Sequence, residues 1–292
     1  MSLETTLNNV TLTYNGSAAL KEISTRLSPG TIYGLLGRNG AGKTSLLSLL
    51  ASFRLPTSGS IQMDEQDPFE NPDIMPQVCF IYAADYSSET ETPADYFDFT
   101  QRYRTDFDRA CAEELAGRFR LPLDKPLSKL SRGMQSAFNA VLGLACRCPL
   151  TLFDEVDLGM DAHARELFCQ EVLHQQERHP RTIVISTHLV SEMNYLFDHV
   201  LILHRGGLLA DESTDSLLAR GASVTGPEQT VDEFTRNHRI LHTRRLGATR
   251  SDMVWGTLGD DGHRKAERLG LEIGPVSLQE LFIHLTREEN SQ

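Results

Sequence analysis

The amino-acid sequence predicts an α/β fold, with a largely parallel sheet, helices on both of its faces and a small α+β appendage at the end. Short apolar runs typical of buried strands alternate with helical patterns, as expected when crossover helices join parallel strands. One run enters a glycine-rich loop that ends in Gly-Lys-Thr, and a leucine-rich segment follows. The 292 residues, 40% hydrophobic and 23% charged, suffice for one large domain plus a small one, or two medium domains.

The N-terminal segment predicts a hairpin, a strand and a helix. Leu7–Tyr14 alternates loosely, and the Asn15-Gly16 pair that follows is favoured in two-residue hairpins. Pro29-Gly30 marks a turn before Thr31–Leu36, a short apolar run typical of a buried strand. The helix is expected at Ser45–Phe53.

The segment from about residue 85 to 145 is expected to be mainly helical. Apolar residues recur at helical intervals in Tyr96–Tyr103 and Cys111–Phe119, and a third helix is expected at about Arg132–Cys146. Leu150–Phe153 is a buried-strand candidate. Helices and strands are then expected to alternate, in the order Ala162–Glu177, Thr182–Ser186, Val190–Phe197 and Val200–Leu203.

A cluster of turn-forming residues marks the expected domain boundary. Gly221, Gly226 and Pro227 punctuate the chain after residue 220. We therefore expect one domain at 1–220 and an accessory α+β domain at 221–292, whose last helix is the amphipathic segment Ser277–Thr286.

Bulk composition argues against several classes of protein. The formal net charge of −12 argues against a nucleic-acid partner, because phosphate backbones are held by clustered Lys and Arg. The chain contains neither an apolar run long enough to cross a bilayer nor the pattern of a secretion signal, so we expect a cytosolic location. The five cysteines are odd in number and irregularly spaced, and they are expected to be plain thiols.

A phosphate-binding loop is the strongest motif in the sequence. The segment fits G-x-x-x-x-G-K-[ST] at every fixed position and lies between an expected strand and an expected helix. Backbone N–H groups of such a loop point at the phosphates, Lys43 adds a positive charge, and the Thr44 hydroxyl is a ligand for Mg²⁺. The nucleotide-binding residues expected here are Gly37, Arg38, Asn39, Gly40, Ala41, Gly42, Lys43, Thr44 and Ser45.

Two acidic residues complete the expected phosphate chemistry. A phosphate loop needs a second contact to Mg²⁺ at the end of a neighbouring buried strand, and Asp154 follows Leu150–Phe153. Glu155 is a candidate general base for the attacking water. Taken alone, Glu155 could equally be a helix-capping or surface acid.

A segment upstream of Asp154 and Glu155 makes the assignment of these two acids more specific. It reads Leu130-Ser131-Arg132-Gly133-Met134-Gln135. Here the sequence resembles the nucleotide-binding domains of ABC transporters, which carry a Leu-Ser-Gly-Gly-Gln-like element before the Asp-Glu pair. Ser131 and Gly133 are retained, Arg132 replaces the first Gly, and Met134 takes the Gln position. This variant resembles ATPase subunits of bacterial ABC-2-type exporters. The resemblance implies that Ser131 and Gly133 hold the γ-phosphate of the ATP bound to the opposite subunit.

Three further residues match motifs of the family, and they occur along the chain in the order that the family has. Tyr14 lies where an aromatic ring stacks on adenine, although an ordinary strand-end tyrosine remains an alternative. Asp161 matches the loop that crosses the dimer interface. His188 ends a strand, as the switch histidine of the family does, and is expected to contact the γ-phosphate.

The sequence departs from the family pattern at three places. The Gln that usually follows the strand Val78–Ile81 is absent, and Ala83 lies nearest its place. Asp85 is close by and could replace that Gln as an oxygen ligand of the metal; otherwise the communication between hydrolysis and the membrane partner is altered. Val156 stands where Pro is usual, and Arg132, noted above, adds a positive charge near the opposite ATP.

The resemblance covers roughly residues 3–220 and implies a P-loop NTPase fold of the ABC type, with a mixed sheet core, an antiparallel β subdomain and a helical subdomain at about 85–145. It implies ATP and Mg²⁺ as ligands, and a head-to-tail dimer formed with a second copy or with a related subunit. It also implies a separate integral membrane permease at the inner face of the cell membrane, contacted near Tyr82–Asp95, with export as the expected direction.

Two other functions stay open at this point. A non-transport ABC ATPase could act as an ATP-gated clamp on nucleic acid or a ribosome, but such proteins often have two ATPase domains, long coiled coils or basic surfaces. A catalytically weak regulatory subunit is the other alternative, because the Gln is absent. ATP turnover of the wild type against Glu155→Gln separates such a regulatory subunit from an active enzyme.

Overall fold

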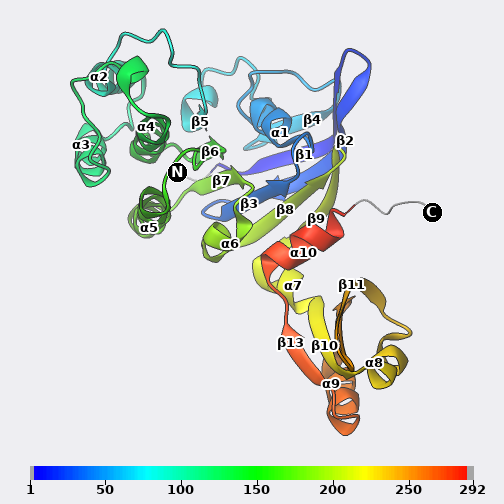
Figure 1. Ribbon diagram of the computed structural model, residues 1–292. Coiled ribbons are helices and arrows are strands. Elements are labelled where there is room, and N and C mark those ends of the chain that lie inside the picture. Colours follow the sequence, from blue (N-terminus) through cyan, green and yellow to red (C-terminus); the bar gives the residue numbers. More distant parts are fainter. Residues whose placement is uncertain (1–2, 288–292) are drawn as a thin grey trace. The chain divides into compact units, whose positions relative to one another are not determined.

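The computed structural model describes residues 3–287, which fold into two compact units (Figure 1). The first unit reaches as far as Leu189 and also contains Tyr195–Asp211. The second unit takes in Val190–Asn194 and the chain from Glu212 onward. The structure therefore divides the chain at Glu212, nine residues before the cluster of turn-forming residues that begins at Gly221.

A six-stranded sheet forms the centre of the first unit, with the strand order β5-β6-β7-β3-β8-β9. The pairs β5–β6, β6–β7, β7–β3 and β3–β8 are all parallel, which confirms the expected largely parallel sheet. Every residue of β3, β6 and β7 is buried, as expected for parallel strands that are covered on both faces. The strand bounds are β3 Ile32–Gly37, β5 Val78–Tyr82, β6 Leu150–Asp154, β7 Thr182–Thr187, β8 His199–His204 and β9 Gly207–Ser213.

A second, antiparallel sheet comprises β1 (Thr5–Tyr14), β2 (Ser17–Leu27) and β4 (Ser58–Met63), in the order β2-β1-β4. The turn between β1 and β2 has positive φ at Asn15 (48°) and Gly16 (82°), as in a type I′ hairpin. This confirms the predicted hairpin. The sequence pattern missed β4, because only two of its six residues are buried.

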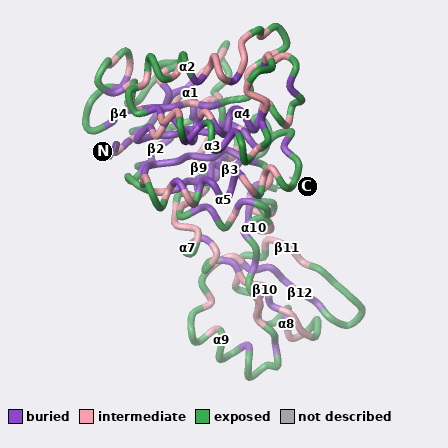
Figure 2. The backbone as a smooth tube through the Cα atoms, turned by 90° about the vertical axis from the view of Figure 1, so that its left-hand side faces the viewer, coloured by how far each residue is buried: buried purple, intermediate pink, exposed green. Residues whose placement is uncertain are grey.

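The helices of the first unit lie close to their predicted places. They are α1 (Lys43–Leu50), α2 (Pro93–Tyr103), α3 (Arg109–Arg118), α4 (Arg132–Ala145) and α5 (Ala162–Arg178). Helix α4 packs closely on β6, since a Cβ atom added to Gly143 would lie 2.4 Å from the ring of Phe153. Buried positions run along α1 and the central strands (Figure 2).

Three short segments within residues 3–287 have 3₁₀ geometry, and one of them corrects a prediction. The helix expected at Val190–Phe197 is instead a single α-turn, α6 (Val190–Met193), followed by a 3₁₀ turn at Asn194–Leu196. The other 3₁₀ turns are Met75–Gln77 and Leu127–Lys129.

The second unit is an α+β fold around a four-stranded antiparallel sheet with the order β11-β12-β10-β13. Its core contains Val224, Val231, Phe234 and Val254. The strands are β10 Gly221–Pro227, β11 Arg239–Leu246, β12 Thr249–Trp255 and β13 Glu272–Pro275; the helices are α7 Thr214–Ala219, α8 Glu228–Thr235, α9 Gly259–Arg268 and α10 Leu278–Leu285.

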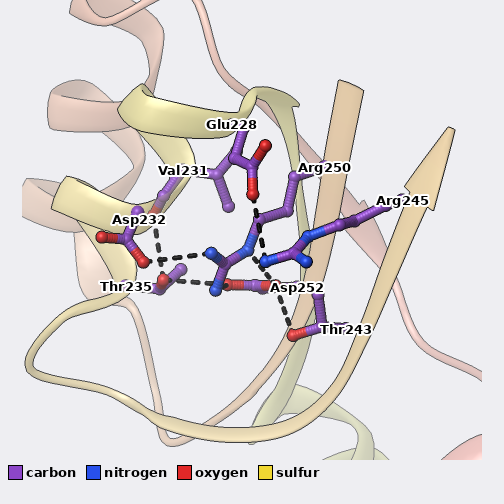
Figure 3. A network of polar contacts seen from close by, with 8 residues as sticks. All are labelled: Glu228, Val231, Asp232, Thr235, Thr243, Arg245, Arg250 and Asp252. Carbon is purple, nitrogen blue, oxygen red and sulfur yellow. Dashed lines mark hydrogen bonds and ion pairs between the residues drawn. The ribbon is translucent and has the colours of Figure 1, made fainter. Parts of the chain in front are cut away.

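A polar network in the second unit centres on Arg250 and Asp252 of β12 (Figure 3). The guanidinium donates two hydrogen bonds to the Asp252 carboxylate, each 2.8 Å long, and a third of 3.0 Å to Asp232. The hydroxyls of Thr235 and Thr243 also donate to Asp252, at 3.0 and 2.8 Å. Burial raises the pKa of Asp252, but the hydrogen bonds from Arg250, Thr243 and Thr235 outweigh burial and lower it.

Replacing Arg250 with methionine is expected to destabilise the second unit by about 3 kcal/mol, because the fully buried Asp252 carboxylate loses its counter-ion. Urea unfolding followed by the fluorescence of Trp255, the single tryptophan, measures this unit. The control is Arg245→Met, whose pair with Glu228 (3.0 Å) is exposed and is worth less than about 1 kcal/mol. Equal destabilisation by the two variants would contradict the assignment.

The same network determines how the stability of the second unit is expected to depend on pH. A carboxyl group whose pKa is lowered on folding stabilises the fold above its ordinary pKa, and this contribution is lost as the pH falls through the lowered value. Trp255 fluorescence should therefore report little loss of stability down to about pH 4 and an increasing loss below it.

Candidate functional site

The predicted phosphate loop joins the end of β3 to the start of α1 (Figure 1). Gly40 and Gly42 have φ of 78° and 108°, values that favour glycine. At Gly42 the reason is also steric, since a Cβ atom there would lie 2.7 Å from the carbonyl oxygen of Ala19. No side chain caps the N-terminus of α1, so its first N–H groups can bind an anion.

Lys43 is held inside this loop by two oxygen partners. Its side chain is only 6% exposed, and Nζ donates a hydrogen bond of 2.9 Å to the carbonyl oxygen of Gly37. The Glu155 carboxylate lies 3.3 Å from the same nitrogen. A phosphate group that binds Lys43 therefore competes with Glu155 for it.

Glu155 is held in an uncommon backbone conformation at the end of β6. Its φ is 50°, in the left-handed region that non-glycine residues seldom adopt. Its N–H group donates to the carbonyl oxygen and hydroxyl of Ser186, at 3.1 and 3.2 Å. These contacts fix the carboxylate next to Lys43, and strained conformations of this kind are common at functional sites.

A pocket of about 570 Å³ gathers several of the predicted residues. Thr44, Ser45, Asp154 and Glu155 all line it, and Tyr14 lies on its wall. The Tyr14 hydroxyl donates a 3.4 Å hydrogen bond to Ser45, and the guanidinium of Arg54 lies 5.0 Å from the centre of the Tyr14 ring. Arg54 therefore covers one face of the tyrosine, and a stacked base would use the other face or displace Arg54.

Ser131, Gly133 and Asp161 lie in a different pocket, of about 580 Å³. Ser131 caps α4 by accepting a 3.3 Å hydrogen bond from the N–H of Met134. Asp161 caps α5 in the same way, at 2.8 Å from the N–H of Ala164. Arg118, Arg120, Arg132 and His163 line this pocket too. The described residues of one chain thus do not bring Ser131 and Gly133 to the phosphate loop.

The remaining predicted residues lie outside both pockets. His188 is exposed and directly follows β7. Asp85 is exposed as well, and its carboxylate accepts a 2.9 Å hydrogen bond from the N–H of Ser87, which lowers the pKa of Asp85. Ala83, not Asp85, lines the pocket beside Asp154. The structure therefore does not bring Asp85 to the predicted metal site.

Comparison with known proteins shows which family has this geometry. The family profile described as ABC transporter matches residues 20–157. Over 195 residues the chain is 32% identical to the putative ABC transporter ATP-binding protein AlbC of Bacillus subtilis, and the match covers 63% of this chain and 81% of that protein. The chain belongs to the ABC transporter ATP-binding proteins. As a member of this family it is an ATPase, which confirms the predicted enzyme class.

A second relative of this ABC ATPase extends the likeness into the second unit. The bacitracin transport ATP-binding protein BcrA of Bacillus licheniformis is 28% identical over 282 residues, which cover 91% of this chain and 89% of that protein.

Solved structures confirm the predicted P-loop fold of the ABC type. One is described as the ATP-binding subunit of an ABC transporter; it is 20% identical, has a TM-score of 0.66, and the match covers 97% of this chain and 99% of that one. Another is an ATP-binding cassette in a dimeric post-hydrolysis state with ADP and Pi. It is 19% identical, with a TM-score of 0.63 and coverage of 72% and 98%.

Two oxygen donors of this ABC ATPase fit a magnesium ion. Asp154 is 6% exposed, and the Thr44 hydroxyl lines the same pocket. Among residues 3–287 no cluster of three or more His, Cys, Asp or Glu could hold a metal. Mg²⁺ does not need one here, because it is usually bound by one or two protein oxygens together with phosphates and water.

Ser186 and Asp157 are site neighbours that the sequence patterns missed. The Ser186 hydroxyl donates a 2.5 Å hydrogen bond to Asp154, and the Thr187 hydroxyl donates one of 2.9 Å to the fully buried Asp157. Burial raises the pKa of Asp157, and the hydrogen bond from Thr187 opposes this effect. The signal was present in the sequence, because Ser186 and Thr187 directly precede His188.

Ser186→Ala is expected to raise the Mg²⁺ concentration needed for half-maximal ATP turnover by about tenfold. The loss of the hydrogen bond to Asp154 frees that carboxylate to rotate, and outer-shell partners of this kind orient metal ligands. A titration of turnover against Mg²⁺ at fixed ATP measures the effect, and Ser186→Thr, which keeps the hydroxyl, should restore most of it. An unchanged requirement in Ser186→Ala would contradict the role.

Within residues 3–287, this ABC ATPase has no helix that combines the length and apolar character needed to span a membrane.

Proposed function

We propose that this ABC ATPase is the ATP-hydrolysing subunit of a transporter whose membrane permease is a separate polypeptide, and that it works as a head-to-tail dimer. One observation carries the proposal. The chain has a phosphate loop around Lys43 and a helix tip at Ser131 and Gly133, but in two different pockets. Two copies facing each other would supply both parts to each ATP. A related cassette is described as dimeric with ADP and Pi.

In each composite site we assign Lys43, Thr44, Asp154, Glu155 and His188 to one chain, and Ser131 with Gly133 to the other. The exposed N-terminus of α4 would meet the γ-phosphate with its N–H groups, the Ser131 hydroxyl and the nearby charge of Arg132. Asp161, which lines the same pocket, would lie at the dimer interface.

The pair between Lys43 and Glu155 gives ATP binding a chemical consequence. The γ-phosphate takes Glu155's place beside Lys43, which frees that carboxylate to accept a proton from the attacking water. Lys43 and the N–H groups at the start of α1 neutralise charge on the phosphates, while in-line attack depends mainly on positioning. Thr44 and Asp154 would hold Mg²⁺, which supplies further charge neutralisation.

ATP binding closes the proposed dimer because the γ-phosphate contacts both chains. Hydrolysis breaks that connection and leaves ADP and phosphate, which repel each other, so the dimer reopens. The opening and closing would drive the permease.

The permease contact is assigned to the segment Tyr82–Asp95. Its first residue, Tyr82, is 44% exposed and packs edge-on against Phe53, which is 63% exposed, with the ring centres 6.3 Å apart. Exposed aromatic side chains favour contact with a protein partner. Binding there would hold the ATPase at the inner face of the membrane. The assignment of export rests on the Ser131–Met134 variant alone.

Site-specific photocrosslinking tests the separate permease. A photoreactive amino acid at Phe53, introduced in the native host, should capture an integral membrane protein. The matched control is Leu173 on α5, which is also exposed and lies away from this segment. Capture of a membrane protein at Phe53 but not at Leu173 supports the proposal. No membrane protein at Phe53 would overturn it.

A further inference from the structure

A third pocket of the first unit, of about 610 Å³, lies at the end of the central sheet opposite to the phosphate loop. Residues just before β5, β6 and β7 line it, namely Gln77, Pro149 and Arg181. Because Asp154 and the phosphate loop follow the carboxyl ends of β6 and β3, the pocket lies at the other end of the strands from the ATP site. The proposed ATPase mechanism does not use it.

Positive charge predominates among the side chains that line this pocket. Four arginines contribute, and Asp106 is the carboxylate among the lining residues; Asp108 also approaches, 2.6 Å from Arg147. The pKa of His179, which lines the pocket too, is lowered, first by burial and then by the charges of Arg147 and Arg181. The four arginines are Arg104, Arg147, Arg178 and Arg181.

Part of the positive charge of these arginines is neutralised by backbone carbonyl groups at the C-terminal ends of α4 and α5. Arg181 donates a 3.1 Å hydrogen bond to the carbonyl oxygen of Leu144, and Arg178 lies in the last turn of α5. However, Arg181 is only 3% exposed, and its Nε and Nη1 atoms have no hydrogen-bond partner in the described part of the chain. The same holds for Nε of Arg147. Buried guanidinium N–H groups without partners favour an anion nearby.

Cys148 is the thiol in the lining of this pocket, and it lies in the pocket wall with 2% of the residue exposed. Nη1 of Arg104 donates a 3.1 Å hydrogen bond to its sulfur. The Cys148 thiol itself donates weak hydrogen bonds of 3.6 Å to the carbonyl oxygens of Pro76 and Cys146, and the thiols of Cys146 and Cys79 lie beside it. The hydrogen bonds from Cys146 and Cys79 lower the pKa of Cys148, burial opposes them, and the charge of Arg104 lowers it further. Contacts with Cys146 and Cys148, together with burial, raise the pKa of Cys79, while the contact with Cys148 and burial raise the pKa of Cys146.

We propose that Cys148 is a modification site, at which an anionic low-molecular-weight disulfide exchanges with the thiolate to form a mixed disulfide. The Cys148 sulfur attacks one sulfur of the small disulfide, and the S–S bond of that disulfide breaks. One half stays on Cys148, and the other leaves as a thiolate and takes up a proton from water. No other oxidant is needed, because the small disulfide accepts the electrons.

The arginines favour the reaction of negatively charged reagents with Cys148. A disulfide that carries carboxylates is attracted into the pocket, and the arginines also stabilise the attacking thiolate, whereas a neutral or cationic reagent gains only the second effect. The pocket volume of about 610 Å³ accommodates a tripeptide-sized group. The inference does not depend on the proposed function, since it uses no residue of the ATP site.

Alkylation rates of the reduced, folded chain test the site. Iodoacetate and iodoacetamide differ in charge but attack the same sulfur, and mass spectrometry resolves the five cysteines. We expect Cys148 to be labelled first, and iodoacetate to react with it at least as fast as iodoacetamide at low salt. In the urea-unfolded chain the same ratio should fall below one. If Cys148 reacts more slowly in the folded chain than in the unfolded chain with both reagents, the proposal is wrong.

Two arginine variants distinguish the effect of positive charge in the pocket from the effect of positive charge elsewhere on the surface. Arg178 and Arg102 are both exposed and both lie in the last turn of a helix, but only Arg178 lines the pocket. Arg178→Gln should lower the ratio of iodoacetate to iodoacetamide rates about threefold, and Arg102→Gln should leave it unchanged. Equal ratios in the two variants would overturn the role of the pocket.

Disulfide exchange itself is tested with oxidised glutathione, an anionic disulfide, against cystamine, a cationic one. Oxidised glutathione should form an adduct on Cys148 several-fold faster than cystamine, and Cys148→Ser should remove the adduct while keeping basal ATP turnover. A faster reaction of cystamine, or an adduct retained in Cys148→Ser, would overturn the proposal.

Discussion

Lys43→Ala is expected to weaken MgATP binding by about 100-fold or more and to abolish measurable turnover. Lys43 is nearly buried at the start of α1, where its ammonium group would contact the terminal phosphates, and charge-assisted hydrogen bonds of this kind contribute about 1.5–3 kcal/mol each. Titration calorimetry with MgATP measures the affinity, and phosphate release measures the turnover.

The control for this variant is Lys21→Ala, which removes an exposed lysine from β2. It should keep wild-type affinity. Thermal unfolding of both variants establishes that each is folded. A Lys43→Ala protein that is folded and binds MgATP within twofold of the wild type would refute the assignment of the phosphate loop.

Glu155→Gln is expected to reduce ATP turnover by about 10²–10⁴-fold while keeping or strengthening MgATP binding. The amide cannot accept the proton of the attacking water, and positioned general bases contribute about this factor. Binding is spared because the carboxylate, 3.3 Å from Lys43, competes with the γ-phosphate for that ammonium group, and the neutral amide competes less. Single-turnover phosphate release and MgATP titration measure the two effects separately.

Glu177→Gln is the matched control for Glu155→Gln, since it makes the same change at an exposed position of α5. Its turnover should equal that of the wild type. If Glu155→Gln also hydrolyses ATP at the wild-type rate, Glu155 is not the base, and the alternative of a weak regulatory subunit gains support.

The parts of the fold that could be predicted from the sequence are those in which local chemistry constrains the residues. The Asn15-Gly16 turn requires positive φ, and the phosphate loop requires glycine at Gly42, so both appear as short motifs. Strand β4 was missed because its exposed residues give no apolar period. Asp85 was considered as a ligand from chain proximity to Ala83 alone, and the turn at Ser87 holds its carboxylate elsewhere.

Features that depend on distant parts of the chain could not be predicted in the same way. Cys79 lies far in sequence from Cys146 and Cys148, and the three thiols meet only because β5 pairs with β6. The network of Arg250 and Asp252 likewise depends on α8 and β11 folding around β12. A cysteine spacing or an Arg-x-Asp triplet has no fixed meaning until the tertiary fold is known.

Mixing two inactive variants measures most directly whether each ATP site is shared between two chains. Ser131→Asp keeps a good helix cap but places a negative charge where the γ-phosphate would bind, and Lys43→Ala disables the phosphate loop. In a head-to-tail heterodimer of the two, one site keeps both Lys43 and Ser131. With random pairing, half of the dimers have one of two sites intact, so we expect about a quarter of wild-type turnover from the mixture. A mixture no more active than either variant alone would contradict the shared site.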